Sequence, residues 1–280
     1  MVNEKISLIF TVYNESENLE LLFESITRQS TLPNEIVICD GGSSDNTINL
    51  IKKFRENSAI EVILIEEKGR INIARGRNLA IKAASGGIIA VTDAGCILDV
   101  DWLSEITKPF SDNNIDVVGG WYEPIIKNSF QKKFAYATLP VLNHIDHDTF
   151  LPSSRSIAFK KNCWSKVNGY PEHLTLSAED TLFDIRLKSF FRFSFSPSAI
   201  ARWEPRDNIK SLIWIHYSMG RGDAEAKIFF KRYVFYLVSI FFPFLYVFTN
   251  KRFNYFFIRY VVMSAGVFGY FANLHKFLRR

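Results

Sequence analysis

The fold is decided by residues 36–45, which read IVICDGGSSD. A short apolar run of β-forming residues passes directly into Asp40, a pair of glycines and a polar loop, and a helix-like pattern begins at Thr47. An apolar run of this length followed by glycine predicts a buried strand that ends in a tight turn before a helix. The same succession of strand, loop and helix recurs on both sides of this stretch.

Strands and helices alternate along the first 98 residues. Strands are predicted at residues 6–12, 36–39, 61–65 and 88–92, and helices at residues 19–26, 47–54 and 73–84. Alternation at this pitch predicts a parallel sheet covered by helices, in an α/β sandwich. Ligands of such sheets bind outside the carboxyl ends of the strands, where this chain has Tyr13, Glu15, Asp40 and Asp93. We therefore expect residues 1–98 to bind a nucleotide.

The composition changes sharply beyond Ala226. Residues 233–249 contain no charged side chain, and residues 260–274 are nearly as apolar. A helix that spans a bilayer needs roughly 20 apolar residues, so the first run just qualifies. Basic residues flank the first run, which indicates an anionic membrane surface and argues against a nucleic-acid partner. We expect residues 227–280 to attach the chain to a membrane, as a hairpin or within the interface; two helices packed on the catalytic domain are the alternative.

The N-terminus and the cysteines indicate a cytosolic catalytic part. The chain enters its first strand without a basic and apolar leader segment. Cys39, Cys96 and Cys163 are far apart and lack the spacing of metal ligands, so we expect reduced, buried thiols. Together with the apolar tail, this predicts a location at the cytoplasmic face of the cell membrane.

Several short motifs occur in a fixed order. They are residues 7–19 (SLIFTVYNESENL), residues 37–47 (VICDGGSSDNT), Arg77-Asn78, residues 92–95 (TDAG) and residues 178–180 (AED). In this order and spacing they resemble family 2 glycosyltransferases, which are inverting enzymes with the GT-A fold. The resemblance covers residues 5–225. It implies a GT-A type α/β sandwich with a mostly parallel central sheet, and the apolar runs beyond it predict C-terminal hydrophobic helices.

The resemblance also implies a domain division and a set of donor-binding residues. Residues 1–226 would form the catalytic domain, with residues 1–98 as the donor half and residues 99–226 as the acceptor half. In the family, the tyrosine and aspartate equivalent to Tyr13 and Asp40 contact the nucleotide base, and a carboxylate can accept hydrogen bonds from a base imide. Asp40 and its two glycines would also make an ordinary strand-to-helix turn. The remaining expected donor-binding residues are Thr11, Glu15, Arg77, Asp93 and Ala94, and we expect residues 43–45 to cap the next helix.

A divalent metal is expected beside the donor diphosphate. Family members usually place a pair of carboxylates after the fourth strand, but here Asp93 is followed by Ala94 and Gly95. One carboxylate, phosphate oxygens and water can still hold Mg²⁺ or Mn²⁺. The resemblance adds His216 as a second metal ligand, although a structural side chain is the preferred interpretation of a lone histidine. Arg77 is the better candidate than Arg75 for phosphate binding.

Glu179 and Asp180 match the family's Glu-Asp motif, whose aspartate serves as general base. Asp180 would therefore take the proton of the acceptor hydroxyl and Glu179 would support it, in a single displacement with inversion. The same pair could serve as an acidic helix N-terminus, and the two roles are compatible. Further along, residues 220–223 (GRGD) predict a flexible turn.

These observations predict a hexosyltransferase-type enzyme. It would move a sugar from a nucleotide sugar, with a UDP-sugar favoured, to a glycan or lipid-linked acceptor at the membrane. A nucleotidyltransferase is an alternative, but it would normally have a glycine-rich triphosphate loop where this chain has TVYNE in residues 11–15. A non-catalytic membrane protein with a degenerate transferase fold is the other alternative, because Gly95 replaces a carboxylate.

Overall fold

The computed structural model describes residues 4–147, 149–242 and 255–278. The chain divides into two compact units. The sheet unit comprises Met1–Glu123, Asp146–Glu172 and Glu179–Glu204, and the helical unit comprises Pro124–Ile145, His173–Ala178 and Pro205–Arg280. The expected assignment of residues 1–226 to a catalytic domain and of residues 227–280 to a tail stays a prediction.

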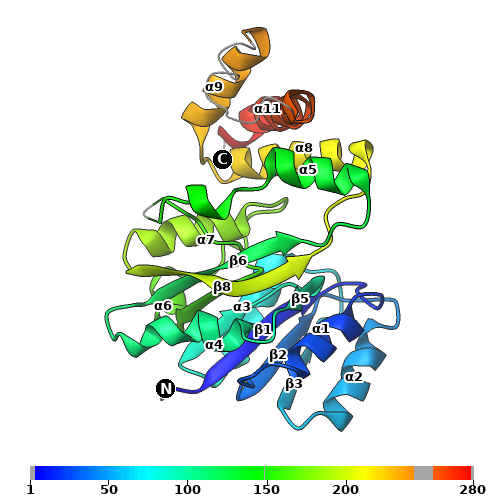
Figure 1. Ribbon diagram of the computed structural model, residues 1–280, viewed down its shortest axis with the longest axis vertical. Helices are drawn as coiled ribbons and strands as arrows, with labels where there is room; N and C mark the ends of the chain where they lie inside the picture. The colour runs from blue at the N-terminus through cyan, green and yellow to red at the C-terminus, as the bar shows by residue number, and fades with distance from the viewer. Residues whose placement is uncertain (1–3, 148, 243–254, 279–280) are drawn as a thin grey trace. The chain divides into compact units, whose positions relative to one another are not determined.

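The sheet unit alternates strands and helices, as Figure 1 shows. Its elements are β1 Ile6–Val12, α1 Leu19–Thr27, β2 Glu35–Asp40, α2 Thr47–Asn57, β3 Glu61–Glu66, α3 Ile73–Ala83, β4 Ile88–Val91, β5 Cys96–Leu98, α4 Trp102–Thr107, η1 Lys108–Ser111, β6 Val117–Pro124, β7 Ile157–Lys160, α6 Lys161–Lys166, α7 Glu179–Lys188 and β8 Phe193–Trp203. The helical unit contains α5 Ser129–Thr138, η2 Leu142–His144, α8 Ile209–Glu225, α9 Phe230–Phe241 and α11 Phe256–Leu278.

The central sheet is mixed. Its strand order is β3-β2-β1-β4-β7-β6-β8-β5. The neighbours β1–β2, β1–β4 and β2–β3 are parallel, whereas β4–β7, β6–β7 and β5–β8 are antiparallel. The α/β sandwich is confirmed, and so are the four strands and three helices expected before residue 98. The strands β5 to β8 were not predicted.

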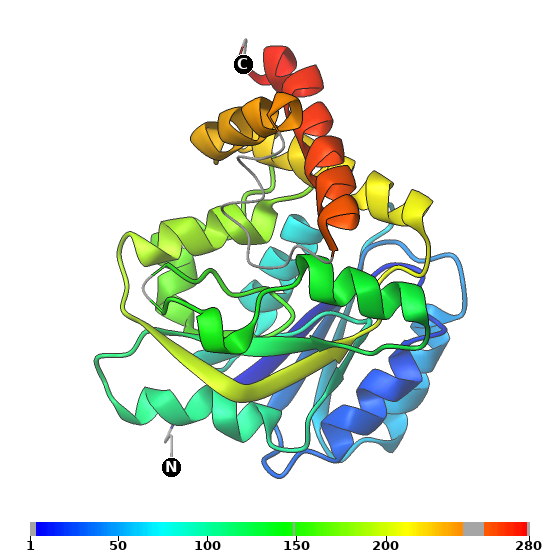
Figure 2. The ribbon, with the colours of Figure 1, turned by 45° about the horizontal axis from the view of Figure 1, so that its top comes forward.

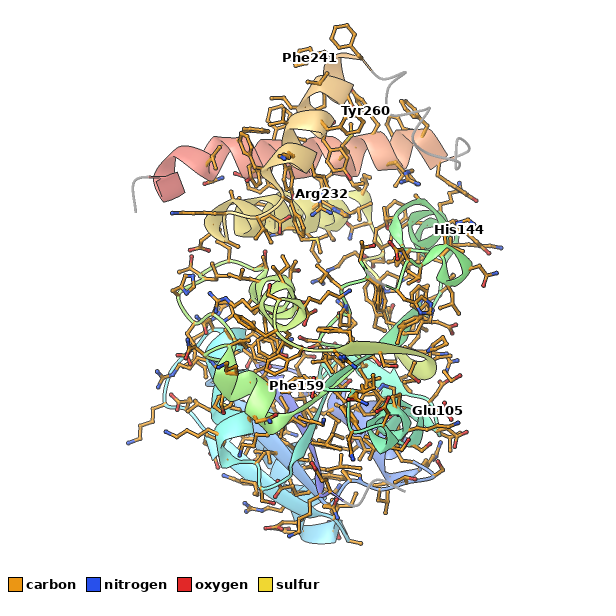
Figure 3. All side chains as sticks on the ribbon, turned by 90° about the vertical axis from the view of Figure 1, so that its left-hand side faces the viewer. Glu105, His144, Phe159, Arg232, Phe241 and Tyr260 are labelled. Atoms are coloured by element: carbon orange, nitrogen blue, oxygen red, sulfur yellow. The ribbon has the colours of Figure 1, made fainter. Side chains whose placement is uncertain are left out.

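Each face of the sheet has its own apolar core. In β1, Leu8 and Phe10 point into the first core, which α1, α2 and α4 cover, while Ile9 points into the second core. The second core is covered by α3, α6 and α7, and Phe159 of β7 lies within it (Figure 3). Alternate residues of a buried strand thus serve both layers, which explains the continuous apolar runs in the sequence.

The cysteine prediction is confirmed for the described chain. Cys39, Cys96 and Cys163 are all free and buried. Burial raises the pKa of each thiol to about 12, so these thiols stay protonated at neutral pH.

The helical unit corrects one expectation. Residues 220–223 do not form a turn; they lie inside α8, which α11 crosses (Figure 2). A Cβ atom on Gly220 would meet the backbone of Gly266 in α11, and a Cβ atom on Gly222 would meet Ser177. The glycines therefore allow close approach of neighbouring backbones, a use that a turn-based interpretation of the sequence overlooks.

One described helix is long and apolar enough to cross a membrane. It is the segment Phe256–Leu274 of α11, with a mean hydropathy of 1.3. The first apolar run, residues 233–249, begins in α9, but its part from residue 243 onward lies outside the described residues. The expected membrane attachment through both runs therefore stays a prediction.

Candidate active site

Three neighbouring strands end at one edge of the sheet. β2, β1 and β4 are adjacent and parallel, so their carboxyl ends lie side by side. Tyr13 directly follows β1, Asp40 is the last residue of β2, and Asp93 follows β4. The topology therefore groups these three side chains at the edge where α/β sheets bind ligands.

The loop after β1 is hydrogen-bonded to the loop after β2. The Asn14 amide donates to Ser43 Oγ at 2.8 Å, and the Ser44 amide donates to Asn14 Oδ1 at 2.8 Å. Asn14 adopts a φ of 53°, a left-handed conformation that asparagine tolerates. Ser43 and Ser44 thus bind the first loop, so the expected capping of α2 by these two serines is wrong. Asp45 Oδ1 does accept from the Thr47 amide at 3.0 Å, while Asn46 occupies the N-cap position without a side-chain hydrogen bond.

The two carboxylate oxygens of Asp40 have different surroundings. Its Oδ2 accepts from the Gly42 and Ser43 amides, both at 2.9 Å. Its Oδ1 is buried and has no hydrogen-bond partner among the described residues. Gly42 has a φ of +89°, and a Cβ atom there would lie 2.7 Å from the Gly69 backbone. The turn therefore requires glycine, and one oxygen of Asp40 stays unpaired among the described residues.

The loop of residues 67–72, between β3 and α3, completes this edge and was missed by sequence reasoning. The Glu67 amide donates to the Asp40 carbonyl at 3.2 Å, and the Ile71 amide donates to the Gly41 carbonyl at 3.3 Å. The guanidinium of Arg70 lies 4.8 Å from the centre of the Tyr13 ring. The available signal was the basic sequence after the third strand, since every parallel strand of such a sheet ends at the same edge.

Arg77 joins two acidic segments that are distant in sequence. Its side chain is 2% exposed, its Nη2 donates to Asp93 Oδ1 at 2.8 Å, and its Nη1 donates to Glu179 Oε1 at 2.9 Å. Burial would lower the pKa of Arg77, but Asp93 and Glu179 outweigh burial and raise it. Helix α3 comes close enough because Gly76 packs on Thr11: a Cβ atom on Gly76 would lie 2.8 Å from Thr11 Cγ2.

Helix α7 opens with Glu179 and Asp180 in its first turn. Burial and the neighbouring Asp180 raise the pKa of Glu179, although Arg77 opposes them. Asp180 Oδ1 accepts from the Thr181 amide at 2.7 Å. Ala178, directly before the pair, has a φ of +71°, an uncommon conformation for a residue with a Cβ atom. The acidic pair thus lies in the first turn of a helix, as one interpretation of the sequence expects, and its catalytic role stays a prediction.

A third carboxyl lies one helical turn beyond Asp180. Asp184 is buried, and neither of its oxygens has a hydrogen-bond partner among the described residues. Burial, and then the charge of Asp180, raise the pKa of Asp184 well above its usual value. Asp184 therefore holds a proton at pH values where an exposed aspartate is ionised.

Arg155 is the second arginine beside Asp93, and sequence reasoning missed it. Its Nε lies 3.9 Å from Asp93 Oδ2, beyond hydrogen-bond distance, and its guanidinium lies 4.5 Å from the centre of the Trp203 ring. A single arginine in a loop has no motif, so only the fold could place it. Asp93 is thus flanked by Arg77 on one oxygen and by Arg155 on the other.

The remaining predicted residues have different surroundings. Glu15 Oε2 accepts from Asn18 Nδ2 at 2.9 Å, while the Ala94 side chain is buried in the first core. His216 belongs to the helical unit, where its ring lies 6.4 Å from that of Phe134, and burial lowers the pKa of His216 to about 4. Its pairing with Asp93 stays a prediction.

The residues around Asp93 fit a metal held mainly by its substrate. Among the described residues, no group of three histidine, cysteine, aspartate or glutamate side chains could hold a metal. The space beside Gly95 is open, since a Cβ atom there would have no neighbour within 4 Å. Asp93 Oδ2 accepts no hydrogen bond from Arg155, so one carboxylate oxygen can serve together with phosphate oxygens and water.

Comparison with known proteins identifies the family. Glycosyl transferase family 2 matches residues 7–171. The O-antigen chain rhamnosyltransferase RfbN of Salmonella typhimurium is 23% identical over 262 residues, covering 84% of this chain and 82% of that protein. Glycosyltransferase AglE of Haloferax volcanii is 34% identical over 118 residues, covering 41% of this chain but only 38% of AglE.

A third relative is the UDP-Glc:alpha-D-GlcNAc-diphosphoundecaprenol beta-1,3-glucosyltransferase WfgD of Escherichia coli. It is 31% identical over 129 residues, covering 46% of this chain and 50% of that protein. The matched region thus spans half or less of AglE and WfgD.

Solved structures show the same fold. A mannosyltransferase from Pyrobaculum calidifontis, in complex with GDP-Man and Mn²⁺, superposes with a TM-score of 0.65 at 18% identity, covering 99% of this chain and 73% of that one. TarS residues 1–349 of S. aureus, in complex with UDP, gives a TM-score of 0.59 at 20% identity, covering 77% of this chain and 64% of that one. The named relatives are glycosyltransferases and none is a nucleotidyltransferase. The chain belongs to glycosyl transferase family 2 and has the GT-A fold.

Proposed function

We propose that this chain transfers a sugar from a nucleotide diphosphate sugar to an acceptor hydroxyl, in one displacement with inversion at the anomeric carbon. The observation that carries the proposal is the double ion pair of Arg77, which ties the strand-end carboxylate Asp93 to the acidic pair at the start of α7. Donor and base would then be held on one rigid frame, and such positioning supplies much of the rate enhancement of a bimolecular transfer.

The nucleotide base would bind between the loops after β1 and β2. Asp40 Oδ1 is a buried acceptor without a partner among the described residues, and leaving it unpaired has a free-energy cost. An imide N–H of uracil could donate to this oxygen, which supports a UDP-sugar as the donor. Tyr13 would stack on the base, while Thr11, Glu15 and Ala94 border the same strand ends.

The diphosphate would lie near Asp93. Asp93, with His216 as the second proposed ligand, would hold Mg²⁺ or Mn²⁺, which offsets negative charge on the departing nucleoside diphosphate. The side chain of Arg155 is 32% exposed and its Nε lies 3.9 Å from Asp93 Oδ2, so its cation could attract the same phosphates. This charge would stabilise the leaving group as its bond to the anomeric carbon breaks.

Asp180 is the proposed general base. As the acceptor oxygen bonds to the anomeric carbon and the bond to the diphosphate oxygen breaks, the hydroxyl proton passes to the Asp180 carboxylate. Glu179 is less suited, because Arg77 Nη1 already donates to it at 2.9 Å. Glu179 would instead keep the start of α7 in place.

Replacement of the base tests this assignment. Asp180→Asn should abolish sugar transfer while nucleotide binding, measured by calorimetry, stays within about twofold, because a lost base affects the transition state rather than donor binding. Asp101→Asn, at an exposed aspartate before α4, is the matched control and should keep full activity. Equal loss of transfer and binding in Asp180→Asn would contradict the assignment.

A donor panel tests the substrate class. UDP-, GDP- and dTDP-sugars would be assayed for nucleoside diphosphate release, each with and without Mg²⁺ or Mn²⁺. We expect release from a UDP-sugar to require the metal, and Asp93→Ala to weaken the metal-dependent part of binding. Unchanged donor affinity in Asp93→Ala would remove this residue from the site.

The acceptor is proposed to be lipid-linked, with the enzyme at the cytoplasmic face of the membrane. The apolar segment Phe256–Leu274 and the name of WfgD, which includes a diphosphoundecaprenol acceptor, support this. We expect the full chain to sediment with membranes after washes at high salt and at alkaline pH. Release by either wash would contradict stable attachment.

A further inference from the structure

One face of α8 is apolar and exposed. Ile213, Trp214 and Tyr217 follow Lys210 at the helical spacings i+3, i+4 and i+7, so the four side chains form one stripe. The Trp214 side chain is 64% exposed, which is unusual for so large an apolar group. Sequence reasoning placed this segment in the catalytic domain rather than in the membrane tail.

Helix α11 adds the second wall. Ala265 and Phe268 lie beside the α8 stripe and, together with it, line a hollow of about 450 Å³. The Phe268 side chain is 66% exposed. The two helices lie close together because a Cβ atom on Gly220 would meet the Gly266 backbone, and one on Gly269 would meet the carbonyl of Tyr217. The hollow is therefore a groove between two tightly packed helices.

The chemistry of the groove selects one kind of ligand. Five of its six lining side chains are apolar, and the sixth is Lys210, at the N-terminal end of the stripe. A hydrocarbon chain with an anionic group at one end matches this distribution. Tryptophan and tyrosine in addition favour the boundary between lipid headgroups and acyl chains.

The same unit has other membrane-compatible features. Helix α11 contains the apolar segment Phe256–Leu274. Helix α9 exposes Phe235, Val238 and Phe241, and Figure 3 shows Phe241 at the end of α9 with its ring pointing away from the neighbouring helices. A bilayer phospholipid is therefore the occupant that the surroundings of the groove favour.

We propose that the groove between α8 and α11 binds the acyl chain of an anionic phospholipid, with Lys210 pairing with the phosphate. This inference rests on the proposed membrane attachment and deepens it, because it makes α8 part of the membrane-binding surface. The surface then includes Trp214, which reports on lipid contact by its fluorescence.

The test is quenching of tryptophan fluorescence by brominated acyl chains. The full chain would be bound to vesicles of phosphatidylcholine and phosphatidylglycerol, with and without bromine on the chains. We expect strong quenching in the wild type and loss of most of it in Trp214→Phe. Trp164→Phe is the matched control, because Trp164 lies in the sheet unit and donates to Asn78; its removal should leave the quenching unchanged.

The role of Lys210 is measured by vesicle affinity. Lys210→Gln should weaken binding to anionic vesicles about fivefold, because one cation at an anionic surface contributes about this factor. It should leave binding to pure phosphatidylcholine vesicles unchanged. Equal affinity of Lys210→Gln and wild type for anionic vesicles would overturn the pairing with phosphate.

The remaining outcomes separate the two proposals. Vesicle binding with quenching that persists in Trp214→Phe would overturn the groove while membrane attachment stands. Failure of the full chain to bind any vesicle would overturn both. If Trp214 fluorescence responds to a soluble polyprenyl phosphate but not to phospholipid, the groove binds an acceptor. If it responds to protein concentration alone, the groove contacts a second copy of the chain. Either result would overturn the proposal of a phospholipid.

Discussion

Replacement of Arg77 by methionine should lower the free energy of unfolding by about 3–5 kcal/mol, because it leaves a buried carboxylate without its cation. The side chain of Arg77 is 2% exposed, and its two hydrogen bonds, at 2.8 and 2.9 Å, both go to carboxylates. Hydrogen bonds to charged groups contribute about 1.5–3 kcal/mol each, so the sum agrees with the range for a broken buried pair.

The ion pairs of Arg77 with Asp93 and with Glu179 should contribute unequally to this loss of stability. Asp93 is 31% exposed and can recover water when the guanidinium is removed, whereas Glu179 is only 13% exposed and cannot. Adding Glu179→Gln to Arg77→Met should therefore restore more stability than adding Asp93→Asn. The penalty should also shrink as pH falls, because Glu179, whose pKa is already raised by burial, then takes up a proton.

The measurement is urea unfolding followed by tryptophan fluorescence, at neutral pH and at pH about 4.5, near the ordinary pKa of glutamate. Arg77→Lys is the second variant: it keeps the charge but can reach only one carboxylate well, so it should lose less than Arg77→Met. A loss below about 1 kcal/mol in Arg77→Met would mean that the pair is screened like a surface salt bridge. Equal rescue by Glu179→Gln and Asp93→Asn would refute the argument from burial.

Three further changes have expected outcomes. Gly42→Ala should destabilise the chain by at least about 1–2 kcal/mol and weaken nucleotide binding in calorimetry, because its φ is +89° and the new Cβ would approach the Gly69 backbone. Asp184→Asn should stabilise the chain against urea at pH 7 and leave its stability unchanged at pH 3. The pKa of Asp184 is raised in the folded state, so ionisation of this carboxyl destabilises the fold as the pH rises from about 4, and asparagine cannot ionise. Gly220→Ala should cost about 1–3 kcal/mol by overpacking against α11 in thermal unfolding, whereas Gly95→Ala, in open space, should not.

The parallel half of the fold could be read from the sequence. Strands β1, β2 and β4 are buried on both faces, so they appear as short continuous apolar runs between polar or glycine-containing loops. The antiparallel half lacks this signal. β5 has only three residues, and β8 mixes buried, half-buried and exposed positions, so neither shows a clear period.

The candidate site residues that belong to short sequence motifs could be predicted. Asp40, Asp93 and Glu179 lie at strand or helix ends that the family pattern marks. The pairing of Arg77 with Glu179 was not predictable, since the two residues are 102 positions apart and no spacing rule connects them. Arg155 was missed for the same reason: a cation in an irregular loop reaches Asp93 only through the path of the chain between β6 and β7.

The contacts of Arg77 also change its expected role. The sequence favoured Arg77 as a phosphate ligand, yet both of its Nη atoms already donate to carboxylates and its side chain is almost fully buried. An arginine held in this way positions Asp93 and the start of α7, and it has little freedom to follow a substrate. Arg155 is the arginine beside Asp93 that keeps solvent contact and donates no hydrogen bond to it.

The different environments of Arg77 and Arg155 predict different roles for the two side chains. Family members usually place a second carboxylate where this chain has Gly95, so less negative charge would face the proposed donor diphosphate, and Arg155 adds positive charge 3.9 Å from Asp93 Oδ2. Coulomb attraction between a guanidinium and a diphosphate needs no metal ligand. We therefore expect Arg155→Met to weaken donor binding even without added metal, and Arg77→Met to act mainly through stability. The opposite pattern, with donor binding lost in folded Arg77→Met and unchanged in Arg155→Met, would show that the buried arginine is the phosphate ligand after all.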